Sequence, residues 1–294
     1  MKDESAVSST GSSVERMLDI FDVEQVGACR FVGTSDGGRR RVVDGSQLLG
    51  QAIVAASKTF PQHTARSAHA VFLRAIDDES KAWFEVEVLH QGRTFASAVV
   101  TVGQHDRQCI TVTVLLDVNH PDVIAHTAAP PAVGGPADAV PFAMSMTGRQ
   151  LRLVGIHDPD DPGEVGPPIL DAWLHYEPIP RRPDLAKALI AHFTGHLSIS
   201  TSMRAHEGIG TSMAHHDLST AVMAISITFH DPVTWDGWLL YHHESTQVGG
   251  GMSYVRGQVF TEEGRLITSF SQDGMIRSFA GDQIALSKSA AERL

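Results

Sequence analysis

Cysteine is scarce in this sequence, where Cys29 and Cys109 are the only two among 294 residues. They do not form a C-x-x-C pair, so a disulfide framework and a cysteine-rich zinc site are not expected. Cys109 opens the alternating stretch "CITVTVLL". That pattern predicts a small buried side chain for Cys109 rather than a reactive thiolate.

Positive charge is also in deficit, with 23 Lys and Arg against 34 Asp and Glu and a net charge of −11. Nucleic acid is therefore not expected as a partner, because phosphate binding needs clustered Lys and Arg. No apolar run approaches the roughly 18 residues of a membrane span. The Ser-rich start lacks the apolar segment of a signal peptide, so we expect a cytoplasmic protein with residues 1–14 as a disordered tail.

No G-x-S-x-G motif occurs, which removes the nucleophile elbow of α/β-hydrolases. What the sequence does contain is one pattern that occurs twice, over residues 65–117 and 219–277. Each copy has a long strand ending in Phe, a short acidic turn, a strand that starts at Trp, and two further strands joined by a polar hairpin. The hairpins are expected at "QHDRQ" and "TEEGR". The matching order indicates an internal repeat.

A helix is predicted before each set of strands. Residues 45–60 and 182–203 both carry apolar side chains at helical spacing. In the second segment, Pro183 suits a first-turn position and Asp184 favours the helix N-terminus. One helix and several antiparallel strands pack best when the sheet curls around the helix. Two such units can then join their sheets edge to edge, which removes an exposed edge.

The fold class that follows is α+β, a double hotdog: two antiparallel sheets, each wrapped around a long helix, joined into one extended sheet. A stretch rich in Pro, Ala and Gly separates the copies. The expected organisation is a tail, an N-terminal hotdog, a linker, a C-terminal hotdog and a second tail, at residues 1–14, 15–117, 118–168, 169–280 and 281–294.

Five segments together are similar to the TesB-like acyl-CoA thioesterase II family, whose members are double hotdogs. In chain order they are "GSQLLGQAIVAASKT", "SAHAVFLRA", "LHQGRTFAS", "TFHDPVTWDGWLLYHHES" and "SQDGMIR". The resemblance spans about residues 15–117 and 170–278. It implies that the protein hydrolyses an acyl-CoA, such as a fatty acyl-CoA, to the free acid and CoA. It also implies direct attack by an activated water, no cofactor, and assembly into a homo-oligomer.

The family resemblance implies that Gln272 belongs to a polar triad that binds and activates this water. Its other members are an Asp near the end of the second helix and a Thr or Ser on the next strand. Here those positions hold Gly195 and Val222, and Ser46 replaces the second Gly of the family's Gly-Gly-Gln. Candidate substitutes are Thr220, on the same strand face as Val222, and His196 or His192, because histidine transfers protons near neutral pH.

Three hypotheses remain open at this stage. The rearranged residues hydrolyse the thioester, or the protein binds acyl-CoA without hydrolysing it, or the fold serves another reaction of a CoA ester, such as hydration. Four arginines are candidates for the CoA phosphates. They are Arg39 and Arg40 before the first helix, and Arg74 and Arg277 at strand ends; solvent-exposed turns and strand ends are the alternative interpretation. The adjacent histidines 242–243 do not predict a metal site, since neighbouring strand residues face opposite ways. The pair 215–216 lies in a loop-like stretch with Asp217, which is slightly more permissive, but no metal is expected there either.

Overall fold

The structure is a computed structural model that describes residues 9–144, 149–230 and 232–279, with the backbone alone at 9–13 and 39. In the described residues, 13 strands form one sheet in the order β1-β2-β4-β5-β6-β3-β10-β13-β12-β11-β9-β8-β7. All neighbouring strands are antiparallel. The strands are β1 Glu24–Gly27, β2 Arg30–Gly33, β3 Thr64–Phe72, β4 Ala82–Gln91, β5 Phe95–Gln104, β6 Arg107–Asp117, β7 Val140–Pro141, β8 Arg149–Val154, β9 Ile169–Tyr176, β10 Leu218–Phe229, β11 Trp238–Gly249, β12 Met252–Thr261 and β13 Leu266–Ser278.

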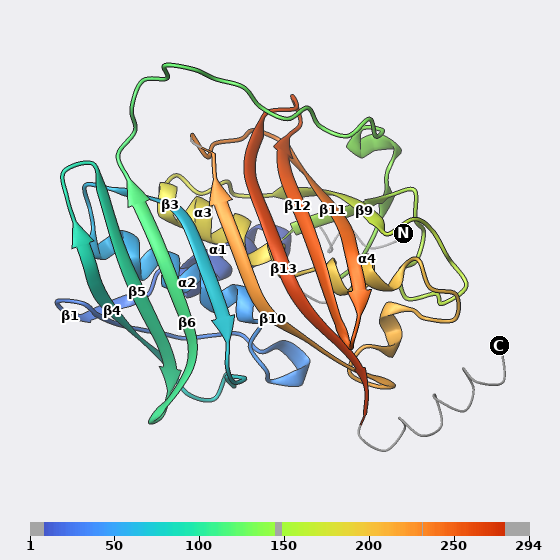
Figure 1. Ribbon diagram of the computed structural model, residues 1–294, viewed down its shortest axis with the longest axis horizontal. Coiled ribbons are helices and arrows are strands. Elements are labelled where there is room, and N and C mark those ends of the chain that lie inside the picture. Colours follow the sequence, from blue (N-terminus) through green and yellow to red (C-terminus); the bar gives the residue numbers. More distant parts are fainter. Residues whose placement is uncertain (1–8, 145–148, 231, 280–294) are drawn as a thin grey trace.

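The two copies of the pattern meet in the middle of this sheet, where β3 pairs with β10 (Figure 1). Ala68 and Ala70 of β3 lie opposite Ile227 and Ile225 of β10. The predicted double hotdog is confirmed, including the edge-to-edge junction. Both predicted hairpins are also present, because β5 and β6 pair up to Gln104–Arg107 and β12 and β13 are joined through the second polar turn.

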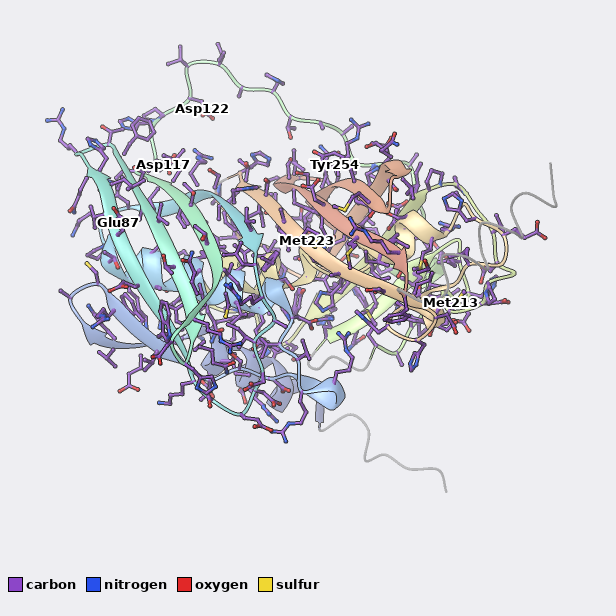
Figure 2. All side chains as sticks on the ribbon, turned by 60° about the horizontal axis from the view of Figure 1, so that its bottom comes forward. Glu87, Asp117, Asp122, Met213, Met223 and Tyr254 are labelled. Carbon is purple, nitrogen blue, oxygen red and sulfur yellow. The ribbon has the colours of Figure 1, made fainter. Side chains whose placement is uncertain are left out.

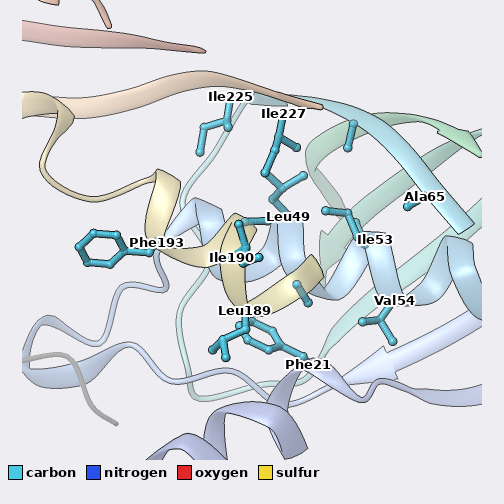
Figure 3. Close-up of a cluster of buried hydrophobic side chains, with 14 of the residues drawn as sticks. Phe21, Leu49, Ile53, Val54, Ala65, Leu189, Ile190, Phe193, Ile225 and Ile227 are labelled. Atoms are coloured by element: carbon cyan, nitrogen blue, oxygen red, sulfur yellow. The ribbon is translucent and has the colours of Figure 1, made fainter. Parts of the chain in front are cut away.

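Helices lie on one face of the sheet, and Figure 1 shows them behind it. They are α1 Ser9–Phe21, α2 Gly45–Thr59, α3 Pro183–Thr194 and α4 Ser198–Met203, with short 3-10 turns at η2 Gly38–Arg40, η3 Pro136–Asp138 and η4 Thr211–Met213. The two long helices pack on each other and on the inner face of the strands. Figure 3 shows this core, where Leu49 and Ile53 of α2 meet Ile190 of α3 beneath Ile225 and Ile227.

Three predicted segments differ from the structure. The helix expected over 182–203 begins at Pro183 as predicted but divides into α3 and α4, because Leu197 takes a left-handed backbone with φ 62°. The expected linker 118–168 contains β7 and β8, which extend the sheet beyond β9. Residues 118–139 do cross the surface between the halves, along the path marked by Asp122 in Figure 2.

The expected N-terminal tail 1–14 overlaps α1, which begins at Ser9 and places Val14 and Phe21 in the core. Residues 1–8 of that tail and the expected C-terminal tail 281–294 lie outside the described residues. Three consecutive glycines at 249–251 form the tight turn between β11 and β12, with φ 61° at Gly250 and 75° at Gly251. Glycine suits these positions because other residues rarely adopt positive φ.

Candidate functional site

Gln272 lies on the inner face of β13, between Val255 of β12 and Ile225 of β10. Its side chain is 1% exposed. Neither the amide nitrogen nor the amide oxygen has a hydrogen-bond partner among the described residues. A buried amide without partners is costly. The position predicted from sequence therefore holds a polar group that is available to a ligand or a water.

The turn between α3 and α4 covers this part of the sheet. A Cβ placed on Gly195 would lie 3.6 Å from Cδ1 of Ile225, the β10 partner of Gln272. The same Cβ would lie 2.4 Å from Oγ of Ser46, in the first turn of α2. Gly195 is therefore close to the Gln272 strand pair, as the resemblance implies. The space that a side chain at 195 would need is filled by Ser46.

One carboxylate and two imidazoles meet beside this turn. A carboxylate oxygen of Asp44 and one ring nitrogen each of His192 and His196 lie within 4.8 Å of one another. Both ring nitrogens of His192 are buried without a hydrogen-bond partner in the described part of the chain. Burial, followed by the charge of Arg149, lowers the pKa of His192 to about 3 and that of His196 well below its usual value. Burial raises the pKa of Asp44.

A row of ring contacts connects this cluster to β13. His196 stacks on Phe193, Phe193 meets the edge of Tyr241, and Tyr241 stacks on His243, whose ring lies 5.3 Å from that of Phe270. Phe270 and Gln272 occupy successive inward positions on β13. The row therefore runs from the end of α3 across β11 to the strand that carries Gln272.

The same interior holds further polar groups without partners among the described residues. The guanidinium of Arg149 lies 4.6 Å above the ring of Phe193, and its Nε and Nη2 are buried without hydrogen bonds. Nε2 of His243 and the hydroxyl of Ser198 are also buried without a hydrogen-bond partner among the described residues. Such a concentration is unusual in a native core, and these groups are available to a ligand or to water.

Thr220 is not brought to Gln272. It pairs with Ile276, four residues further along β13, which corresponds to roughly 13 Å at the rise of a strand. Its hydroxyl lies 3.5 Å from both ring nitrogens of His215. Val222, the position that the resemblance aligns with the family's hydroxyl, pairs with Gly274 and is nearer to Gln272 than Thr220 is.

The four candidate arginines have different surroundings. Arg40 is exposed, lies 3.8 Å from a carboxylate oxygen of Asp44, and is one of the charges that lower the pKa of His215 after burial itself. Arg74 donates to the carbonyl of Gln108 at 2.8 Å. Arg277 is exposed and lines a cavity of about 450 Å³ with Gly250 and Gly251. For Arg39, only the backbone belongs to the described residues.

Sequence reasoning missed Asp44, Arg149 and His243. Asp44 precedes the first helix directly, where aspartate usually caps the helix, so its alternative use could not be recognised. His243 belongs to one of the adjacent histidine pairs in the sequence, and this pairing was the only signal for it. His243 is buried, whereas His242 faces outward, where its Nδ1 lies 2.7 Å from Oδ1 of Asp171. Asp44, His192 and His196 also form a donor set that suits zinc.

The fold is that of a double-hotdog protein, with a group of buried polar side chains in its interior. The family description "Acyl-CoA thioesterase N-terminal domain" matches residues 37–116, and "Acyl-CoA thioesterase C-terminal domain" matches residues 125–276. The chain belongs to this acyl-CoA thioesterase family, which confirms the resemblance noted in the sequence.

Relatives match along most of the chain. Acyl-CoA thioesterase 2 of Haemophilus influenzae is 26% identical over 286 residues, which cover 90% of this chain and 98% of the relative. Acyl-coenzyme A thioesterase 8 of Mus musculus is 26% identical, with 79% of each chain covered. Among solved structures, a tesB protein of Mycobacterium avium subs paratuberculosis has a TM-score of 0.77 at 24% identity, covering 90% of this chain and 99% of its own. That structural likeness supports the fold.

In the described residues, no helix is both long enough and apolar enough to cross a membrane.

Proposed function

We propose that this protein is an acyl-CoA thioester hydrolase that releases the free acid and CoA. The observation that carries the proposal is the buried amide of Gln272, which has no protein partner among the described residues and lies beneath the turn that follows α3. Family membership supports the substrate class. We take the acyl group to be apolar, because apolar side chains surround the interior between the helices and the sheet.

The proposed chemistry is direct attack of a water on the thioester carbonyl, without a covalent acyl-enzyme. Gln272 holds this water through its amide oxygen, and His196, which follows Gly195, is the candidate for proton transfer. Most of the rate enhancement comes from positioning the water and polarising the thioester carbonyl. Binding the water next to the acyl carbon removes the entropy cost of bringing the two together. Thr220 lies too far along β13 to share this water, so we assign it no role in the step.

The remaining assignments rest on position. Arg40 lies beside Asp44 at the start of α2, and Arg277 lines an open cavity at the end of β13. Both are exposed and can meet the CoA phosphates. Arg74 already donates to a backbone carbonyl and is the weaker candidate. We propose a cytoplasmic location and a homo-oligomer from composition and family resemblance alone.

The test is thiol release from a panel of acyl-CoAs of increasing chain length. Gln272→Ala should lower kcat by about 100-fold, the scale of losing a positioned hydrogen bond in a water-excluded site. Gln272→Glu serves as a nearly isosteric companion variant. The melting temperature of Gln272→Ala should stay close to that of the wild type, because the amide contributes no hydrogen bond within the described residues. Gln272→Glu should melt at a lower temperature, because it buries a carboxyl group without a partner.

The competing hypothesis is a protein that binds acyl-CoA without hydrolysing it. It predicts saturable acyl-CoA binding, no thiol release by the wild type, and no effect of Gln272→Ala. An enoyl-CoA in the same panel covers the hydration hypothesis, which predicts loss of the conjugated double bond without thiol release. Either result would overturn the proposed hydrolysis.

A further inference from the structure

Asp44 occupies the N-cap position of α2 but does not act as a cap. Its backbone is extended, with φ −63° and ψ 132°, and its side chain makes no capping hydrogen bond. An N-cap aspartate ordinarily accepts from the second or third helical N–H. Here the carboxylate instead lies within 4.8 Å of the ring nitrogens of His192 and His196. Instead of capping the helix, the side chain of Asp44 in the first hotdog lies beside two histidines of the second.

We propose that Asp44 positions and electrostatically supports His196 as the general base of the hydrolysis, in place of the carboxylate that Gly195 lacks. This inference rests on the proposed function. His196 suits the role better than His192 because it follows Gly195, which lies over the β10 partner of Gln272. His192 is more deeply placed, 1% exposed against 7%, and its ring packs edge-on against Phe21.

The step balances as follows. The water oxygen forms a bond to the acyl carbon while one of its protons moves to a ring nitrogen of His196. The imidazolium that forms is stabilised by the carboxylate of Asp44. Collapse of the tetrahedral intermediate breaks the carbon–sulfur bond, and the leaving CoA thiolate takes the proton from His196. The products are the carboxylic acid and CoA thiol, and the enzyme returns to its starting protonation state.

The charges around the cluster favour this role over that of a metal site. Nε and Nη2 of Arg149 on β8 are buried, and its positive charge lowers the pKa of both histidines after burial itself. A divalent cation held by the same three side chains would be repelled by that guanidinium. A single proton shared between Asp44 and His196 adds far less charge. The other titratable or charged groups that face the cluster are Arg40 on η2, Asp36 just before η2, Tyr176 on β9, and Tyr241 and His243 on β11.

The experiment compares Asp44→Asn and His196→Gln with the wild type in steady-state thiol release across pH. Each substitution should lower kcat by about 100-fold, a typical contribution of general base catalysis, while KM changes less than twofold. Asp44→Asn should also move the acidic limb of the kcat/KM profile to lower pH, because the imidazole loses its neighbouring negative charge. The double variant should lose no more than His196→Gln alone, since the two residues act as one unit.

Asp171→Asn is the matched control, because Asp171 forms a similar aspartate–histidine pair with His242, and neither residue is one of the three clustered side chains. It should keep wild-type kcat. Asp44→Ser keeps a residue that is favourable at an N-cap and excludes loss of folding as the cause. Wild-type-like kcat in Asp44→Asn, or multiplicative losses in the double variant, would overturn the inference while Gln272→Ala still reports on the proposed function. Loss of wild-type activity after chelation, restored by zinc, would also overturn it and assign the three side chains to a metal.

Discussion

Gly195 and Ser46 occupy one space between the end of α3 and the start of α2. In the sequence they are two separate departures from the family pattern, an Asp replaced by Gly and a Gly replaced by Ser. The structure shows that they are one packing solution, because a Cβ on Gly195 would lie 2.4 Å from Oγ and 2.5 Å from Cβ of Ser46. A side chain can be present at either position, but not at both without movement of a helix.

This relation predicts that Gly195→Ala destabilises the fold by about 1–3 kcal/mol, the usual cost of overpacking. The backbone alone predicts the opposite sign, because Gly195 has a right-handed helical conformation in which Ala is better than Gly. Adding Ser46→Gly should restore most of the loss. Urea unfolding of the two single variants and the double variant measures the coupling. Additive effects would show that the two side chains do not compete for space.

Part of the site was predictable at the level of single residues and part was not. Gln272 was found because it breaks an alternating strand within a recognisable motif. The role of Asp44 could not be found, because an aspartate directly before a helix has the same sequence pattern whether it caps the helix or not. Thr220 shared a strand face with Val222 as expected, but only the pairing register revealed its distance from Gln272.

At the scale of elements, α3 of the second half is attached to β3 of the first by a buried lysine. Nζ of Lys187 donates to the carbonyl of Ala65 at 2.7 Å and to the hydroxyl of Thr64 at 3.2 Å. It also lies 5.4 Å from the ring of Phe229 on β10. The register of β3 shifts between Ala65 and Ser67, so this carbonyl lies where the ladder with β6 is interrupted. Lys187 satisfies it from the helix side.

We therefore expect Lys187→Met to lower the free energy of unfolding by about 1–3 kcal/mol, the cost of leaving a buried acceptor unpaired. Methionine has a similar length and preserves the packing of the stem. Lys81→Met is the control, because Lys81 is exposed and its ion pair with Glu24 is worth little. Chemical denaturation of both variants is the measurement. Equal stability would mean that apolar packing of methionine compensates for the lost hydrogen bonds.

The order of the elements followed from periodicity and turn chemistry, but two features did not. The break between α3 and α4 lies within a continuous apolar pattern, and no glycine or proline at residue 197 marks the left-handed backbone of Leu197. The strand β8 was hidden because the surrounding Pro and Gly residues have linker composition. Its pairing partner β9 lies many residues away in the chain.

At the scale of the whole molecule, the two halves are joined where β3 pairs with β10. Arg66, at the β3 register shift, donates to Asp117 of β6 at 2.8 Å and to the carbonyl of Phe229 of β10 at 3.0 Å. Asp117 is labelled in Figure 2. The candidate site also spans the halves, with Asp44 and Ser46 from the first and His196 and Gln272 from the second. Neither half carries a complete site, so the function proposed here requires the doubled fold.

We expect the free energy of unfolding to fall in mild acid, because two buried histidines resist protonation in the folded protein. Burial is the main cause that lowers the pKa of His192 to about 3 and that of His243 to about 4 in the folded chain. In the unfolded chain a histidine has a pKa near 6.5, so below about pH 6.5 the unfolded state binds more protons than the folded state. The free energy of unfolding therefore rises with pH through this window and decreases as the pH falls from about 6.5 toward 4.

Each of these histidines should contribute a slope of about 1 kcal/mol per pH unit between pH 6 and 5, a range in which most carboxylates remain ionised. His243→Leu should remove one such contribution and flatten the dependence, whereas His126→Leu, at an exposed position, should leave it unchanged. Urea unfolding at several pH values between 7 and 5 measures the slope. A wild-type stability that stays constant over this range, or that increases toward pH 5, would show that these imidazoles are solvated or paired with acids in the folded protein.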